Sequence, residues 1–256
     1  MSGMVEHEGR EESGRLRRAD GVELAWKRIL GRAPTIVFLH GFRSDMESGK
    51  ASYLAASAEA QGHAMLRLDY SGHGVSGGGF EEGSIGLWTE DALAVIDAET
   101  AGPLILVGSS MGGWIGLNLA LRRPDRVAAF IGIAAAPDFT ETLIWNAMTE
   151  AERAELRDRG VIHAPSDYGE PIPITYRLIE EGRSHLLLGG PIPLTCPVRL
   201  LQGQRDADVP WQTALAIAEK AETEDLRVIL VKDGDHRLSR ESDLALLGQT
   251  VAEFLA

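Results

Sequence analysis

The sequence predicts an α/β fold, in which a mostly parallel sheet is covered by helices on both faces. Short apolar runs alternate along the chain with segments of helical periodicity, which is typical of parallel strands joined by crossover helices. Glycine or proline follows several of the helical segments and ends them. The chain has 256 residues, of which 44% are hydrophobic, and this is enough for the core of one α/β domain.

Each predicted element is supported by its local pattern. Strands are assigned to short runs in which apolar residues predominate, and the first of them, at 22–29, is expected to be antiparallel. Gly62 ends the first helix, Gly102-Pro103 ends the second, and Pro124-Asp125 breaks the third. The predicted strands cover 22–29, 35–39, 64–68, 104–107, 127–133, 198–201 and 226–231, and the main predicted helices cover 50–61, 85–99, 111–122, 211–221 and 242–254.

This alternation stops between residues 138 and 190. The segment is helical and rich in proline, without a clear strand, and we interpret it as a cap inserted into the domain. Residues 1–20 mix acidic residues with arginines and lack an apolar core, so they predict a flexible N-terminal tail. Residues 21–256 are then expected to form a single domain.

Charge and cysteine content limit the classes of partner. The net charge of −13 argues against nucleic acid, whose phosphates require lysine and arginine, and against anionic membrane surfaces. No apolar run reaches the roughly 18 residues that a membrane span requires, and no signal or transit peptide is visible. The single cysteine, Cys196, excludes an intrachain disulfide. We therefore expect a cytoplasmic protein; the sequence leaves its oligomeric state undefined.

The most informative segment is Gly108-Ser109-Ser110-Met111-Gly112. It follows an apolar run and precedes a helical pattern, so it predicts a strand, a tight turn that carries one serine, and a helix. The two glycines leave room for the strand and the helix to pack. Ser110 is therefore the candidate nucleophile, and Ser109 is interpreted as a small residue beside the turn.

A second match to Gly-x-Ser-x-Gly, at Gly74-Val75-Ser76-Gly77-Gly78, lacks this context. No apolar strand leads into it, and glycine-rich, acidic sequence follows it. We interpret this second match as a loop.

Two later loops supply the partners that a serine nucleophile needs. The hydroxyl requires a histidine to take its proton and a carboxylate to orient that histidine. Asp206 and Asp208 both follow the strand at 198–201; we prefer Asp206, which lies earlier in the loop, because Asp208 can cap the next helix. His236 follows the last predicted strand and is the candidate base, with Asp235 beside it as a loop anchor.

Two backbone N–H groups are candidates for binding the oxyanion that forms during attack. One belongs to Met111, directly after the nucleophile. The other belongs to Phe42, in the loop after the strand at 35–39, where Gly41 lets the backbone turn. The side chain of His40 is expected to brace this loop without taking part in the chemistry.

Several motifs together carry a resemblance to a known family. They are Leu68-Asp69-Tyr70-Ser71-Gly72, 105–114, 191–197, Val209-Pro210-Trp211 and Asp235-His236-Arg237. On these motifs the chain resembles the serine hydrolases of the α/β-hydrolase superfamily, and within it the mitochondrial palmitoyl-protein thioesterases and their bacterial relatives. The chain departs from that family at His40-Gly41-Phe42 and at Gln202-Gly203, where Pro-Gly-Tyr and His-Gly are expected.

The resemblance implies an α/β-hydrolase fold with a mostly parallel eight-stranded sheet, helices on both faces and a small helical cap inserted after strand 6. It assigns the nucleophile, acid and base to Ser110, Asp206 and His236, in agreement with the reasoning from spacing. It also implies a serine esterase or thioesterase that removes acyl groups.

The sequence thus predicts a hydrolase of ester or thioester bonds that works through an acyl-enzyme intermediate, without a cofactor or a metal. The expected substrate is a small molecule with an ester or thioester bond, or an acylated protein. One alternative is an aminopeptidase on the same fold, which would need cap acids such as Glu141, Glu150 and Glu180 to hold an amine. Another is a non-catalytic ligand receptor on a hydrolase scaffold.

The cap contains four large side chains that are candidates for contact with the acyl group. Each of them is at least equally well explained as a residue that packs the cap onto the core. These candidates are Trp145, Met148, Tyr168 and Tyr176.

Overall fold

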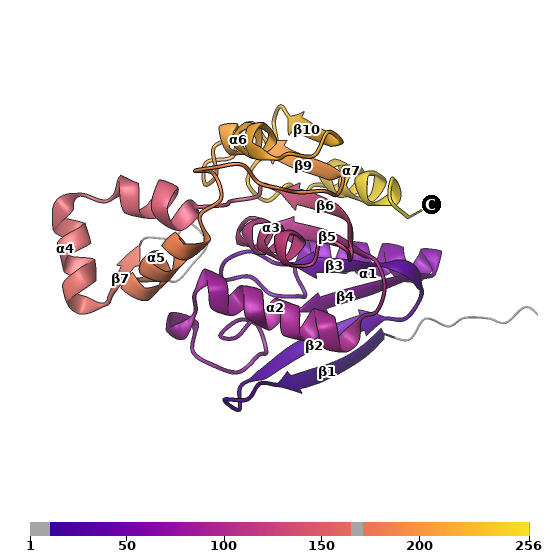
Figure 1. Ribbon diagram of the computed structural model, residues 1–256, viewed down its shortest axis with the longest axis horizontal. Coiled ribbons are helices and arrows are strands. Elements are labelled where there is room, and N and C mark those ends of the chain that lie inside the picture. Colours follow the sequence, from indigo (N-terminus) through magenta and orange to yellow (C-terminus); the bar gives the residue numbers. More distant parts are fainter. Residues whose placement is uncertain (1–10, 165–170, 256) are drawn as a thin grey trace, which may run out of the picture.

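The computed structural model describes residues 11–164 and 171–255 (Figure 1). Eight strands form one sheet: β1 (Glu11–Arg17), β2 (Glu23–Ile29), β3 (Arg32–Leu39), β4 (His63–Leu68), β5 (Leu104–Ser109), β6 (Val127–Ile133), β9 (Val198–Gly203) and β10 (Leu226–Val231). Their order across the sheet is β1-β2-β4-β3-β5-β6-β9-β10. The pairs that involve β2 are antiparallel and the others are parallel, so the predicted fold class is confirmed.

Helices cover both faces of this sheet (Figure 1). Successive strand residues point to opposite faces. In β3, Val37 and Leu39 therefore belong to one apolar core, and Ile36 and Phe38 belong to the other. The first core is covered by α2 (Ile85–Glu99), α3 (Met111–Arg122) and α6 (Gln212–Lys220), and the second by α1 (Gly49–Gln61) and α7 (Glu241–Ala252).

The segment between β6 and β9 leaves the sheet and lies to one side of it (Figure 1). It includes a short hairpin, where the sequence predicted no clear strand. Each of its strands has only four residues and Pro173 lies within the second, so the pairing leaves little trace in local periodicity. The segment contains short helical turns at Thr140–Ile144, Trp145–Ala147 and Arg183–His185, the helices α4 (Glu150–Arg159) and α5 (Tyr176–Gly182), and the strands β7 (Val161–Ala164) and β8 (Ile172–Thr175); a further turn, Phe80–Glu82, precedes α2.

The prediction of a flexible tail over residues 1–20 is wrong from Glu11 onward. Glu11–Arg17 form the edge strand β1, which pairs along its whole length with β2. Leu16 packs against the core, but charged residues dominate the strand, as is common at sheet edges, and this composition hid it. Residues 1–10 and Tyr168 lie outside the described residues. Among the described helices, none is both long and apolar enough to cross a bilayer.

Candidate active site

Ser110 occupies the turn between β5 and α3. Its backbone has φ 54° and ψ −120°, a conformation that a non-glycine residue keeps only when the surrounding structure enforces it. The N–H of Ser110 donates to the carbonyl of Ile133 at 2.9 Å. A Cβ on Gly108 would lie 2.3 Å from the carbonyl oxygen of Gly112, and a Cβ on Gly112 would lie 2.1 Å from that of Leu39. Both glycines of the motif are therefore required for the turn.

His236, in the loop after β10, joins the two other predicted side chains. Its Nε2 lies 3.1 Å from Ser110 Oγ, and its Nδ1 lies 2.9 Å from Asp206 Oδ2. When Nδ1 carries the proton, the ring donates to Asp206 and Nε2 accepts from the serine hydroxyl. This is the arrangement in which a histidine removes the proton of an attacking serine. The structure thus brings together three side chains from the carboxyl ends of β5, β9 and β10.

Asp206 is held by four hydrogen bonds and its side chain is fully buried. Its Oδ1 accepts from the backbone N–H groups of Asp208 and Val209 at 2.9 and 2.8 Å, and Gln202 Nε2 donates to Oδ2 at 2.9 Å. Burial raises the pKa of this carboxyl, but the hydrogen bonds from His236 and from the backbone outweigh burial and keep the pKa below its ordinary value. Asp206 therefore stays ionised and can stabilise a charged imidazole.

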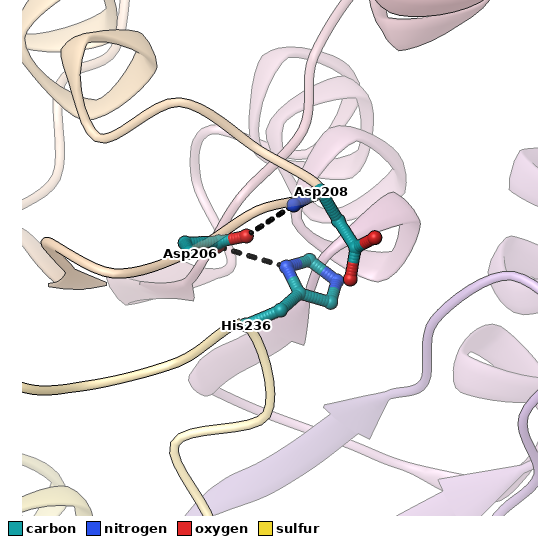
Figure 2. Close-up of side chains that lie close together, drawn as sticks. All are labelled: Asp206, Asp208 and His236. Atoms are coloured by element: carbon teal, nitrogen blue, oxygen red, sulfur yellow. Dashed lines mark hydrogen bonds and ion pairs between the residues drawn. The ribbon is translucent and has the colours of Figure 1, made fainter. Parts of the chain in front are cut away.

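Asp208 is exposed, and Figure 2 draws no hydrogen bond between its carboxylate and His236. Its backbone N–H donates to Asp206 Oδ1 at 2.9 Å. Asp206, Asp208 and His236 each place one oxygen or nitrogen within 4.8 Å of the others, a spacing at which a metal ion is conceivable. However, Asp206 and His236 already bond each other, and Asp206 accepts two backbone N–H groups besides. The donor set fits an acid–base pair better than a metal centre.

The loop after β3 passes beside the nucleophile. A Cβ on Gly41 would lie 3.3 Å from Ser110 Cβ, so this loop approaches the serine closely. His40 Nδ1 donates to the carbonyl of Gly41 at 2.9 Å. The N–H of Phe42 belongs to the same peptide unit and points the opposite way. Met111 directly follows Ser110 and begins α3, so the two predicted oxyanion donors lie in segments next to the serine.

His40 is a buried structural residue of this loop. Complete burial lowers its pKa to about 3, and the charge of His73 contributes to the shift. The ring is therefore neutral near pH 7 and can fix the Gly41–Phe42 peptide without exchanging protons. This geometry agrees with the bracing role expected from the sequence.

A cavity of about 420 Å³ opens beside Ser110 and His236. Its wall includes Phe42 from the β3 loop and Ile172 from β8 in the cap. The rest of the described lining comes from strand ends, the start of α1 and the loop that carries the histidine: Phe38, His40, Gly41, Arg43, Ser44, Ser48, Gly49, Lys50, Ser109, Arg237 and Ser239.

The predicted cap contacts Trp145, Met148 and Tyr176 are not among the residues that line this cavity. Trp145 is almost fully buried in an apolar cluster of the cap itself, and Met148 and Tyr176 pack against that cluster. The rings of Trp145 and Tyr176 lie 6.2 Å apart. Trp145 is engaged by three guanidinium groups, those of Arg153, Arg157 and Arg183, which lie 4.8 to 5.3 Å from its ring.

Sequence reasoning missed two residues of the site. Gln202 lies at the end of β9, and its side chain donates a hydrogen bond to Asp206. In the sequence, only the departure of Gln202-Gly203 from the family pattern pointed to this residue. Lys50 lines the cavity and donates to the carbonyl of Arg237, which is 187 residues further along the chain. No local pattern predicts a contact of that separation.

The order serine, aspartate, histidine along the chain, with each residue after a parallel strand, is that of the α/β hydrolases. Comparison with known proteins agrees with this class. A family model described as Serine aminopeptidase, S33, matches residues 32–161. The human mitochondrial palmitoyl-protein thioesterase ABHD10 is 40% identical over 242 residues, which cover 94% of this chain and 79% of the human protein. The chain belongs to the ABHD10 family of α/β hydrolases and is an enzyme of the hydrolase class.

Solved structures confirm the fold and the resemblance. Mouse α/beta hydrolase domain-containing protein 10 superposes with a TM-score of 0.88 at 40% identity, covering 95% of this chain and 98% of the mouse chain. A protein of Agrobacterium vitis S4 superposes with a TM-score of 0.93 at 39% identity, covering 96% of this chain and all of its own. These comparisons contradict the expectation of a cytoplasmic protein, because the curated mammalian relatives are named as mitochondrial.

Proposed function

We propose that the protein hydrolyses carboxylic esters or thioesters by transferring the acyl group to Ser110. The observation that carries this proposal is the double contact of His236, at 3.1 Å to Ser110 Oγ and 2.9 Å to Asp206 Oδ2. The thioesterase names of the mammalian relatives favour the same reaction. The substrate is a small ester or thioester, or an acylated protein.

The first step forms the acyl-enzyme. Ser110 Oγ attacks the carbonyl carbon while its proton passes to His236 Nε2, and Asp206 stabilises the resulting imidazolium. The N–H groups of Phe42 and Met111 bind the oxyanion, and each such donor contributes roughly 3 kcal/mol to stabilisation of the transition state. The leaving alcohol or thiol then takes the proton from His236.

The second step releases the acid. A water molecule loses a proton to His236 Nε2 and attacks the acyl carbon, and the proton returns to Ser110 as the ester bond breaks. The ring thus acts as a base twice and as an acid twice. The hydrogen bonds that Asp206 accepts from Gln202, Asp208 and Val209 fix its carboxylate, and this carboxylate keeps the proton of His236 on Nδ1 through both steps.

We also propose that the chain from Glu11 onward acts as one domain, since β1 belongs to the same sheet, and that the cap, 138–190, borders the substrate entrance. Trp114 Nε1, in α3, donates to the carbonyl of His185 at 2.9 Å. The backbone N–H of Gly86, in α2, donates to Glu181 at 3.1 Å. These contacts hold the cap against the helices of the core, and Ile172 extends it to the cavity.

Aminopeptidase activity would need a cap carboxylate to bind the amine of the substrate. Each candidate is instead paired with an arginine. Glu141 and Glu180 contact Arg183 at 2.8 and 3.2 Å. Glu150 contacts Arg157 at 3.4 Å. This pairing favours the esterase reaction over the aminopeptidase reaction.

Turnover of p-nitrophenyl butyrate and of a butyryl thioester, with aminoacyl amides as the competing substrates, tests the proposal. We expect ester and thioester hydrolysis, labelling of the protein by a fluorophosphonate, and loss of both in Ser110→Ala. Preference for aminoacyl amides would support the aminopeptidase instead. A folded protein that neither turns over nor reacts with the fluorophosphonate would be a receptor.

A further inference from the structure

The cavity beside Ser110 has basic and hydroxyl side chains that the proposed reaction does not use. Among the described residues that line it there is no aspartate or glutamate. This contrasts with a chain that carries 38 acidic and 25 basic residues. We call this group the basic wall; it consists of Arg43, Lys50 and Arg237 with the hydroxyls of Ser44, Ser48 and Ser239.

Lys50 is the residue that ties this wall to the catalytic loop. Its Nζ donates to the carbonyl of Arg237 at 2.5 Å and lies 3.5 Å from Ser239 Oγ. Burial lowers the pKa of Lys50 to about 8, and the charge of Asp235 opposes the shift. Below that pH the side chain is an ammonium group, partly withdrawn from water, at the edge of a cavity that also holds Ser110. Its remaining N–H can bind an anion there.

Part of the wall belongs to the loop that carries His236. His236 returns its proton to the leaving group, so that group must lie near the imidazole ring. Arg237 and Ser239 follow His236 in the same loop, and Lys50 binds that loop. An anion held by the wall therefore belongs to the leaving alcohol or thiol and not to the acyl chain.

We propose that the basic wall binds a phosphate group carried by the leaving thiol or alcohol. This inference rests on the proposed function and specifies its substrate class. A phosphate monoester carries close to two negative charges and three acceptor oxygens, which match several cations and hydroxyls. A carboxylate offers one charge and two oxygens, and it would leave part of the wall unmatched. Arg43 and Arg237 make contacts elsewhere as well, so Lys50 carries the inference.

The reaction is the same acyl transfer with this leaving group. The bond between the acyl carbon and the thiol sulfur breaks, and the bond to Ser110 Oγ forms. The sulfur takes the proton from His236 and leaves as a free thiol with its phosphate intact. Water then hydrolyses the acyl-enzyme, so no oxidant, reductant or metal takes part.

Two matched pairs of butyryl thioesters test the inference. One pair is formed with 2-mercaptoethyl phosphate and 2-mercaptoethanol, and the other with 3-mercaptopropionate and 3-mercaptopropionamide. We expect kcat/KM to be about tenfold higher for the phosphate than for its neutral partner, since one charge-assisted contact contributes about that factor. Added salt should reduce this ratio because it screens the charges. The carboxylate pair should show a smaller ratio.

Variants of Lys50 separate its charge from its structural contact. In Lys50→Gln the phosphate-to-neutral ratio should fall to about one, and in Lys50→Arg it should be retained. Comparing the ratio within each variant cancels any displacement of His236. Lys220→Gln, at the end of α6, removes a surface lysine outside the cavity and should leave the ratio unchanged.

The outcomes also separate this inference from the proposed function. If wild-type protein hydrolyses neither neutral thioester, the proposed function is wrong. If it hydrolyses the neutral thioesters but gains nothing from phosphate, only this inference is wrong. A carboxylate ratio as large as the phosphate ratio, or a phosphate ratio unaffected by Lys50→Gln, would also overturn it. Equal losses for charged and neutral substrates would show that Lys50 acts only on the loop.

Discussion

The pattern Gly-x-Ser-x-Gly occurs twice in this chain, and the two copies have unrelated structures. Ser110 lies in a strained turn with its Oγ 3.1 Å from His236 Nε2. Ser76 lies in the loop after β4, where its hydroxyl accepts from the N–H of Ala25 at 2.8 Å and donates to the carbonyl of Asp69 at 2.7 Å. One hydroxyl faces a base, and the other is committed to the backbone.

The comparison shows that the pattern by itself has no chemical meaning. A strand that enters the turn, a helix that leaves it and a histidine delivered by a distant loop give Ser110 its reactivity. Ser76 has none of these, and its hydrogen bonds fasten the loop to β2 instead. The two serines are therefore natural controls for each other.

The largest expected difference is between Ser110→Ala and Ser76→Ala. The first removes the nucleophile and should lower kcat for p-nitrophenyl butyrate by at least about a thousandfold. The second removes a backbone partner and should lower the free energy of unfolding by about 1 kcal/mol, with turnover retained. Steady-state kinetics and urea unfolding measure the two effects. A folded but inactive Ser76→Ala would invalidate the comparison.

The second prediction concerns the carboxylate that orients His236, the base that Ser110 has and Ser76 lacks. Asp206→Asn should lower kcat by roughly 10²- to 10⁴-fold, because an amide cannot stabilise the charged ring or hold its tautomer. Asp208→Asn should change kcat only a few-fold, since its backbone N–H still bonds Asp206. Rates of both variants with the same ester check this, and a larger loss in Asp208→Asn would identify Asp208 as the acid.

The sequence was sufficient where the signal was local. Ser110 is recognisable because an apolar strand, two glycines and a helix lie within a few residues of it. Asp206 and His236 follow from the rule that the carboxyl ends of parallel strands meet at one edge of a sheet. The strands of the sheet core are predictable because their signal is also local: each is a short run in which apolar residues predominate.

Other features depend on partners that are distant in the chain. β1 has a largely charged sequence and becomes a strand only by pairing with β2. Trp145 looks like a ligand contact until the arginines around its ring are known. Lys50 reaches the cavity wall through a contact with Arg237. Local periodicity carries no information about such contacts.

The third prediction compares glycines of the two serine segments. A Cβ at Gly112 would lie 2.1 Å from the carbonyl oxygen of Leu39, so backbone must move to accommodate alanine. Gly112→Ala should therefore lower the free energy of unfolding by about 2 to 3 kcal/mol. A Cβ at Gly77 would lie 3.4 Å from its nearest neighbour, an ordinary contact, and Gly77→Ala should cost less than about 1 kcal/mol. Urea unfolding of both variants tests the difference, and equal losses would contradict it.

The smallest expected effect is a pH dependence in the loop that holds Ser76. His73 is buried there, and burial lowers its pKa to about 4, although Ser71 and Asp91 oppose the shift. The unfolded chain binds a proton near pH 6.5, whereas the folded chain does not until about pH 4, so stability is lost as the pH falls between these values. For His73 this loss amounts to about 2 kcal/mol at pH 5 relative to pH 7.

His73→Phe should remove that contribution. The ring lies 5.0 Å from Phe80 and 4.9 Å from Trp88, so an aromatic substitute retains the packing. His40, whose pKa is lowered to about 3, titrates in the same direction, and the variant should therefore reduce the slope of unfolding free energy against pH without abolishing it. Urea unfolding at pH 7, 6 and 5 measures the slope. An unchanged slope would mean that His73 takes up its proton at the same pH in the folded and unfolded protein, and that this loop is less tightly closed than the serine turn to which it has been compared.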